Sequence, residues 1–289
     1  MMEAPDACSL CRGGPPRFAF RLSRGDVTRC QDCGGFMVQD TFVSAEQDRK
    51  FHEGIEERLF VQYFEPFRKG QYRQVLSRLG PAPGSRLLDV GASYGWMLEV
   101  GSDFGLDCYG VEPTPVHYEP PLSGRIVRRT LDDHAAQTGE TYAIVTLWHV
   151  MEHLRDPVLA ATQIHRLLSD GGHAVIGVPN ARGRMYRLGL ALSGAFRSQR
   201  LLEELWYTGN PNMHRYYFSE VALRHVLRTA DLQVVDAYAV DAFDWRRIWS
   251  RSTNTAGRTI LRAIGPAIAW SGFTANENLV VVAEKRMQP

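Results

Sequence analysis

The chain has 289 residues, which is enough for one large domain and a small one, and 44% of them are hydrophobic, as in a globular protein. Its 33 basic and 32 acidic residues give a formal net charge of +1, which excludes a strong general field for nucleic acid or acidic membranes. No apolar run has the length of a bilayer span or the pattern of a secretory signal, so we expect a cytoplasmic protein.

Four of the five cysteines form two C-x-x-C pairs near the N-terminus, and these are Cys8, Cys11, Cys30 and Cys33. Each pair can form a tight turn that presents two thiolates to one tetrahedral ion, so we expect a zinc site. Alternating residues at 17–22 and 36–38 predict strands, and residues 1–45 are interpreted as a zinc ribbon. Four protein ligands leave no open position for water, which favours a structural role. Two disulfides are the alternative, which a cytosolic chain disfavours.

Residues 46–84 are predicted to form helices between the ribbon and the next domain. Apolar side chains recur at helical spacing, and Pro66 and Gly70 are expected to divide the run into two helices. The aromatic side chains are interpreted as core, although helices at this place can also cover a cofactor. The segment 80–84, rich in glycine and proline, is a connector.

The stretch 86–98 predicts a strand, a glycine turn and a helix in direct succession. The apolar residues between Leu87 and Val90 are typical of a parallel strand that is buried on both faces. Gly91 and Gly95 allow a sharp turn and a close approach of the backbone to a ligand.

An acidic residue ends the second predicted strand, which covers 108–111. Glu112 follows it about 20 residues after the glycines, where nucleotide-binding α/β folds hold a ribose diol. The glycine turn lacks the third glycine with which dinucleotide-binding folds receive a pyrophosphate, so a dehydrogenase is disfavoured.

The third predicted strand, at 142–147, leads into polar and aromatic residues at the sheet edge where ligands bind. His149, Glu152 and His153 have the spacing i, i+3 and i+4, which would place them on one face of a helix. H-x-x-E-H is also a zinc-protease signature, but that motif needs a long helix in a different fold. Further strands are predicted at 173–178, 232–235 and 279–283.

Two segments, 181–213 and 241–276, are long for connectors between sheet elements and are interpreted as helical insertions. The first is rich in arginine, leucine and aromatic residues, which favours a substrate cover over contact with a membrane or a lipid tail. Tryptophan and arginine in the second are typical of a binding or oligomer surface, and they would also suit an anionic or membrane-bound substrate.

Four segments follow one another along the chain: LLDVGASYGWML, YGVEP, AIVTLWHVMEHLRDP and GGHAVIGVPN. Together they resemble class I S-adenosylmethionine-dependent methyltransferases of small molecules, well over about 85–180 and loosely over about 214–285. The resemblance implies a doubly wound α/β domain at 85–289 with a seven-stranded, mostly parallel, Rossmann-like sheet whose last strand is antiparallel. Tyr94 departs from the family, which often has a small residue there, and makes the loop bulkier over the methionine end.

The resemblance also implies a pocket for S-adenosylmethionine. Asp89 suits the cationic sulfonium and the methionine end, Glu112 suits the ribose, and residues 131–132 would border the adenine. The residues expected to bind the cofactor are Asp89, Gly91, Tyr94, Gly95, Glu112, Leu131, Asp132 and Trp148. Helix capping is the alternative role for Asp89 and for Asp132.

A second metal site is implied by one part of the family. In ubiquinone-pathway O-methyltransferases and small-RNA 2′-O-methyltransferases the segment E-x-x-E-H holds a divalent ion against the substrate hydroxyl, and a later histidine matches His214. This chain has His149 in place of the first glutamate. Such a cation would lower the pKa of a bound hydroxyl. Alternatively, His149 or His214 acts as a metal-free base, or His153 only anchors the loop. The catalytic candidates are His149, Glu152, His153 and His214.

We therefore expect methyl transfer from S-adenosylmethionine to a small-molecule, sugar or lipid-linked acceptor, with O-methylation ahead of C- or N-methylation. The chain has no Asn-Pro-Pro-Tyr motif at the strand tip, which disfavours methylation of nucleobase amines. The alternatives are a zinc-ribbon RNA methyltransferase, which the near-neutral charge disfavours, and a non-catalytic scaffold on the same fold.

Overall fold

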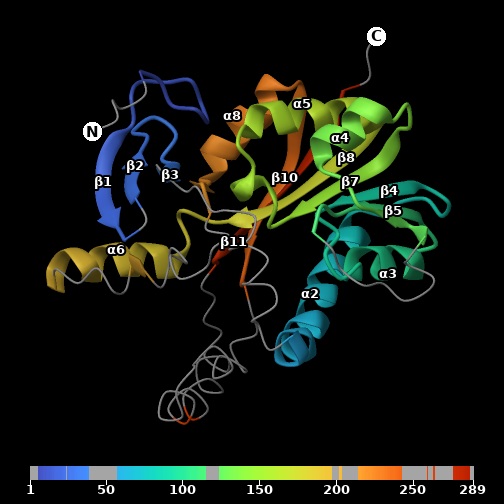
Figure 1. Cartoon of the computed structure of the whole chain (residues 1–289), viewed down its shortest axis with the longest axis horizontal. Coiled ribbons are helices and arrows are strands. Elements are labelled where there is room, and N and C mark those ends of the chain that lie inside the picture. The colour runs from blue at the N-terminus through green and yellow to red at the C-terminus, as the bar shows by residue number, and fades with distance from the viewer. Residues whose placement is uncertain are drawn as a thin grey trace.

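The computed structural model describes residues 6–23, 25–38, 57–114, 124–196, 202–203, 214–242, 259, 263 and 276–286. Within this part the chain forms a seven-stranded sheet flanked by helices, with a four-stranded sheet beside it (Figure 1). The helices are α2 (Glu57–Leu79), α3 (Trp96–Asp103), α4 (Leu131–Gln137), α5 (Pro157–Leu167), α6 (Arg184–Phe196) and α8 (Glu220–Thr229), with a 3₁₀ turn η2 (Met151–His153).

The large sheet has the strand order β6-β5-β4-β7-β8-β11-β10. The pairs from β6 to β8 are parallel, and β11 runs antiparallel to both of its neighbours. Its strands are β4 (Arg86–Val90), β5 (Asp107–Val111), β6 (Ile126–Val127), β7 (Tyr142–Trp148), β8 (Leu168–Pro179), β10 (Leu232–Val240) and β11 (Asn278–Lys285). The predicted seven-stranded, mostly parallel Rossmann-like sheet is confirmed.

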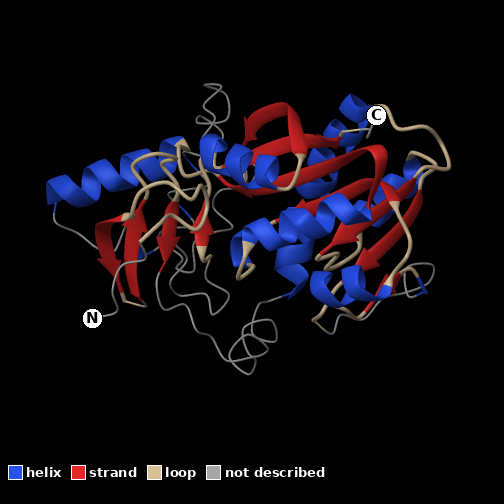
Figure 2. Cartoon of the chain, turned by 90° about the horizontal axis from the view of Figure 1, so that it is seen from above, coloured by secondary structure: helices blue, strands red, loops and turns tan. Residues whose placement is uncertain are grey.

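Helices cover both faces of this sheet, as a doubly wound fold requires (Figure 2). α2 and α3 share a core with Leu87, whereas α4, α5 and α8 share the opposite core with Leu88. Consecutive strand residues point to opposite faces, so a strand that is apolar throughout supplies both cores.

β8 begins at Leu168, earlier than the predicted start at residue 173. Leu168 pairs with Tyr142 at the start of β7, and the register shifts before the next pair, between Ile144 and His173. This irregular pairing draws the Asp-Gly-Gly segment into the strand, whereas periodicity alone gives a helix end there.

α2 is one helix from Glu57 to Leu79, so the prediction that Pro66 and Gly70 divide it into two helices is wrong. A proline inside a helix removes one backbone hydrogen bond and crowds the preceding turn. Tertiary packing offsets this cost, because Val75 and Leu76 are fully buried in the core that α2 shares with the sheet.

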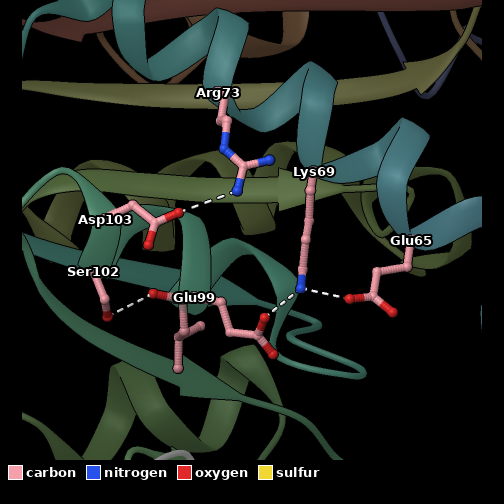
Figure 3. A network of polar contacts seen from close by, with 7 residues as sticks. Glu65, Lys69, Arg73, Glu99, Ser102 and Asp103 are labelled. Atoms are coloured by element: carbon pink, nitrogen blue, oxygen red, sulfur yellow. Dashed lines mark hydrogen bonds and ion pairs between the residues drawn. The ribbon is translucent and has the colours of Figure 1, made fainter.

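Ion pairs fasten α2 to α3 (Figure 3). Lys69 bonds Glu65 one turn earlier in α2 at 2.6 Å and also bonds Glu99 of α3. Arg73, the next residue on the same helix face, pairs with Asp103 at 3.1 Å. These contacts fix the position of α2 relative to the helix that follows the glycine turn.

The small sheet joins the N-terminal segment to a distant part of the chain. Its order is β1 (Arg17–Leu22), β2 (Gly25–Arg29), β3 (Phe36–Val38) and β9 (Tyr216–Tyr217). β3 and β9 pair antiparallel. The predicted ribbon therefore shares one sheet with a segment that lies beyond β8 in sequence.

The described part of the 181–213 insertion packs against this small sheet. Tyr186 of α6 contacts Tyr217 of β9 with ring centroids 5.6 Å apart, and Leu202 lies in the same core. The carboxylate of Glu203 accepts hydrogen bonds from the N–H and the hydroxyl of Ser23 at 2.6 and 2.9 Å. These residues pack on the ribbon sheet. The substrate cover predicted for 181–213 stays a prediction, and 197–201 and 204–213 lie outside the described residues.

Other expectations also reach beyond the described residues. Most of the 241–276 insertion and the segment 39–56 lie outside them, so the boundaries 1–45, 46–84 and 85–289 stay predictions. Among the described helices, none combines the length and the apolar character that crossing a bilayer requires.

Candidate active site

The turn between β4 and α3 forms a tight bend at the carboxyl edge of the large sheet. Gly91 and Gly95 have φ values of 74° and 77°, in the left-handed region that favours glycine. A Cβ atom on Gly91 would lie 2.4 Å from Cγ2 of Val150, so the turn leaves no space for a side chain. Ser93 between them also has a positive φ, of 44°. Non-glycine residues with a left-handed backbone conformation are frequent at ligand-binding sites, where surrounding contacts compensate the backbone strain.

Asp89 lies in β4 just before this turn and is buried. Thr146 of β7 donates its hydroxyl hydrogen to Oδ1 of Asp89 at 2.5 Å. Burial and, more weakly, the charge of Glu112 raise the pKa of Asp89 to about 7, against the lowering effect of the bond from Thr146. Gly95, not Asp89, occupies the N-cap position of α3, so the capping alternative for Asp89 is wrong.

Glu112 directly follows β5 and fastens the glycine turn to the end of that strand. Its Oε2 accepts the N–H of Ser93 at 3.0 Å, and its Oε1 accepts the N–H of Thr114 at 2.9 Å. Each carboxylate oxygen keeps a second lone pair, so the same side chain can still accept hydrogen bonds from a diol.

Two aromatic candidates differ in their surroundings. Tyr94 in the glycine turn stacks on Trp96 with ring centroids 5.1 Å apart. Trp148 ends β7, and its ring lies against Gly177 of β8, where a Cβ atom would approach the indole to 2.8 Å. Tyr72 of α2 contacts the Trp148 ring edge-on, with ring centroids 5.2 Å apart. Trp148 is thus enclosed between the sheet and α2.

The predicted adenine-bordering residues lie at the start of α4. Leu131 is buried, and Oδ1 of Asp132 accepts a hydrogen bond from the amide of Gln163 in α5 at 2.8 Å. Thr130 caps α4 by accepting the N–H of Asp133, so the capping alternative for Asp132 is wrong.

The four catalytic candidates converge on one carboxylate. Glu152 is fully buried, and its Oε1 lies 3.0 Å from Nδ1 of His149 and 3.9 Å from Nε2 of His214. The rings of His153 and His214 have centroids 4.8 Å apart. One ligand atom from each of Glu152, His153 and His214 lies within 4.8 Å of the others, which is the spacing of a metal site.

Local backbone geometry positions this cluster. β7 ends at Trp148, and His149 turns the chain into η2 with a φ of 58°, its N–H bonded to the carbonyl of Gly177 at 2.8 Å. η2 carries Glu152 and His153, a single tight turn rather than the longer helix face that the spacing allowed. His214 lies just before β9, far along the chain from η2.

Burial sets the protonation of the cluster. It raises the pKa of Glu152 to about 7, while nearby cationic groups oppose the rise. Burial also lowers the pKa of His149 and of His214 well below the usual value. The charge of Arg68 adds to the effect at His149, and the neighbouring histidines add to it at His214. Both imidazoles are therefore neutral near pH 7 and present lone pairs.

The donor set fits a divalent cation. Oε2 of Glu152 is buried and has no hydrogen-bond partner among the described residues. A buried acceptor without a hydrogen bond costs free energy, and a bound cation would offset that cost. Two imidazoles and a carboxylate suit a borderline or transition ion.

The four ribbon cysteines lie as a zinc site requires. Sγ of Cys8 is 3.9 Å from Sγ of Cys33, and Sγ of Cys11 is 3.6 Å from Sγ of Cys30. Tetrahedral zinc with Zn–S bonds of about 2.3 Å places its sulfurs about 3.8 Å apart. The cysteines are free thiols rather than disulfides, so the geometry supports the zinc interpretation.

The two C-x-x-C pairs form matching turns. The N–H of Arg12 bonds the carbonyl of Cys8 at 2.8 Å, and the N–H of Gly34 bonds the carbonyl of Cys30 at 3.0 Å. Both residues stand four positions after the first cysteine of the pair and have positive φ, 55° and 72°. Equal spacing thus produces equal backbone turns.

Arg68 also lies at the site, although no sequence pattern singled it out. Its guanidinium carbon lies 5.5 Å from the centre of the Trp148 ring, and its charge helps to lower the pKa of His149. The available signal was helical spacing, because Arg68 and Tyr72 are one turn apart and both face Trp148.

A doubly wound sheet with this strand order, a glycine turn after β4 and an acid after β5 defines an S-adenosylmethionine-dependent methyltransferase. Residues 64–237 match the family model described as methyltransferase domain, and the chain belongs to this family.

Named relatives agree with this assignment. A Ruegeria pomeroyi protein named ubiquinone biosynthesis O-methyltransferase is 26% identical over 192 residues, which are 63% of this chain and 74% of the relative. A Vibrio vulnificus protein of the same name is 29% identical over 139 residues, 45% of this chain and 58% of the relative. The chain thus spans little more than half of the Vibrio protein's length.

A solved structure shows the same fold. The S-adenosylmethionine-dependent methyltransferase from Archaeoglobus fulgidus matches with a TM-score of 0.51 at 19% identity, covering 80% of this chain and 100% of that one. At this level of identity the likeness shows the fold alone.

Proposed function

We propose that this methyltransferase methylates a hydroxyl oxygen of a small molecule. The hydroxyl loses its proton at the cluster of Glu152, His153 and His214. The observation that carries the proposal is the convergence of a buried carboxylate and two imidazoles at the carboxyl edge of the sheet. Relatives named ubiquinone biosynthesis O-methyltransferases favour oxygen over carbon or nitrogen as the acceptor atom. Free, sugar-borne and lipid-linked hydroxyls all suit this chemistry.

The cofactor would lie across the glycine turn. Glu112 accepts hydrogen bonds from the ribose diol, and Asp89 faces the methionine ammonium. Tyr94 covers the methionine end, and Leu131 and Asp132 border the adenine. Support comes from the position of these residues along one sheet edge, in the order that the parts of the nucleoside require. Enzymes of this kind act mainly by holding nucleophile and sulfonium in line.

Glu152, His153 and His214 would hold a divalent cation. Such a cation lowers the pKa of a hydroxyl that it binds. His149 bonds Oε1 of Glu152 and so orients the carboxylate. Without a cation, the neutral imidazole of His149 or His214 is the base that removes the hydroxyl proton.

The test is methyl transfer from labelled S-adenosylmethionine to pooled metabolite extracts and to a panel of hydroxylated compounds. Methyl ethers are the expected products. Glu152→Gln should lower turnover by about 100-fold or more and leave cofactor affinity within about twofold. Glu140→Gln, a change of the same kind at an exposed glutamate, is the matched control and should leave turnover unchanged.

A chelator separates the two forms of the proposal. Elemental analysis first checks that the cysteine-bound zinc stays in place. Loss of activity that Mn²⁺ restores supports a cation at Glu152, and full activity after chelation supports the metal-free base. Methylation that survives both Glu152→Gln and His214→Ala contradicts the proposal.

A further inference from the structure

The ribbon and the candidate active site are joined by a short run of backbone hydrogen bonds. Val38 at the end of β3 donates its N–H to the carbonyl of Arg215 at 2.9 Å. Arg215 donates its own N–H to the carbonyl of Glu152 at 2.8 Å. Arg215 is therefore bonded on one side to the ribbon and on the other to the turn that carries Glu152, and His214 directly precedes it.

A second link runs through a buried hydroxyl. Ser219 is fully buried, donates to the carbonyl of Cys33 and accepts the N–H of Ala222 at 3.0 Å, which caps α8. Cys33 is one of the four candidate zinc ligands. Gly35, two residues later, lies so close that a Cβ atom there would be 3.3 Å from Cβ of Ala222. The turn formed by Cys30 and Cys33 thus packs against the first turn of α8.

Side-chain packing completes the connection. Tyr217 is fully buried, pairs with Phe36 of β3, and lies 5.2 Å from the ring of His214 between centroids. The ribbon strand and the catalytic candidate are therefore in contact with the same residue.

We propose that the zinc ribbon positions His214 and Glu152, with Ser219 as the positioning residue that fixes segment 214–219 to the ribbon. A ribbon of three short strands buries too little apolar surface to hold its shape without a metal. Loss of zinc removes the strand partner of β9, and segment 214–219 loses the backbone hydrogen bonds that join it to β3. The catalytic importance of His214 rests on the proposed function, whereas its positioning by the ribbon does not.

Hydrogen–deuterium exchange on the full chain tests this inference. The protein is compared with and without zinc, which is removed by a mercurial thiol reagent and a chelator. Exchange of segments 214–219 and 151–155 should rise by about tenfold or more, while 86–98 keeps its protection. Cofactor affinity, measured by calorimetry, should stay within about twofold, and kcat should fall by about tenfold or more.

Three variants keep all four cysteines and separate positioning from general destabilisation. Ser219→Ala should raise exchange at 214–219 and lower kcat at unchanged zinc content, and Ser219→Thr, which retains a hydroxyl, should restore both. Thr130→Ala removes the cap of α4 alone and should leave 214–219 protected.

The outcomes are distinct. Unchanged protection at 214–219 after both zinc removal and Ser219→Ala overturns the inference, as does a uniform rise in exchange over the whole chain. A local rise in exchange, combined with a His214→Ala variant of normal turnover, supports the positioning by the ribbon and contradicts the proposed function.

Discussion

Gly91 shows how the backbone conformation of one residue shapes the turn where the cofactor is proposed to bind. Its positive φ and the nearby Val150 side chain leave glycine as the residue that fits without strain. Val150 lies in the loop that leads to Glu152, so the glycine turn and the turn that carries Glu152 pack directly on each other.

Gly91→Ala should therefore lower the free energy of unfolding by about 1–3 kcal/mol and weaken S-adenosylmethionine binding by about tenfold or more. Gly124→Ala is the matched control, because a Cβ atom there meets nothing within 4 Å and φ is not positive. Urea denaturation and calorimetry measure both effects. Normal cofactor affinity in Gly91→Ala would contradict a ligand at this turn.

Asp89 should give the cofactor affinity a pH dependence. The carboxylate form attracts the cationic cofactor, so binding lowers the pKa of Asp89 below its value of about 7 in the free protein. Affinity should then fall as pH drops below about 7, by up to about tenfold per pH unit, and level off above.

Calorimetry between about pH 5.5 and 7 measures this dependence, because the cofactor's amino group stays protonated there. Asp89→Asn should flatten the profile, whereas Glu152→Gln, which removes the other acid with a raised pKa, should leave it intact. A flat profile in the unmodified protein would contradict the role given to Asp89.

At the scale of elements, the contact of α2 with α3 decides how Arg68 and Tyr72 face Trp148. Lys69 and Arg73 hold one side of α2 while its neighbours face the site. The Lys69 side chain is 15% exposed and has two carboxylate partners, whereas the Arg73–Asp103 pair is about half exposed.

Lys69→Met should therefore lower the free energy of unfolding by about 1–2 kcal/mol, since it leaves two carboxylates facing each other without a cation. Arg73→Met should cost about 0.5 kcal/mol or less, because water screens an exposed pair. Urea denaturation of the two variants makes the comparison, and equal losses would show that α2 is not fastened mainly by Lys69.

At the scale of the whole molecule, the ribbon sheet, α6 and β9 form one unit with the large domain. Elemental analysis should find about one zinc per chain bound at the cysteines, and titration with a mercurial reagent should release it as the thiols react. Less than about 0.2 zinc per chain after purification in zinc-containing buffer would contradict a resident ion.

The sequence by itself determined the local features of this protein. The bend at Gly91 and Gly95, the equal turns of the C-x-x-C pairs and the buried strands follow from residues within a few positions of one another, so the family and the seven-stranded sheet were predictable. The pairing of β3 with β9 was not, because two short strands far apart in sequence leave no periodic signal.

The tertiary structure alone decided which distant residues meet. Because Val75 and Leu76 pack in the core, α2 continues past Pro66, although proline locally disfavours a helix interior. His214 was predicted by resemblance, but its approach to Glu152 accompanies backbone hydrogen bonds of the adjacent Arg215 to β3 and to η2. Such contacts arise from chain closure over long separations, and no local pattern encodes their geometry.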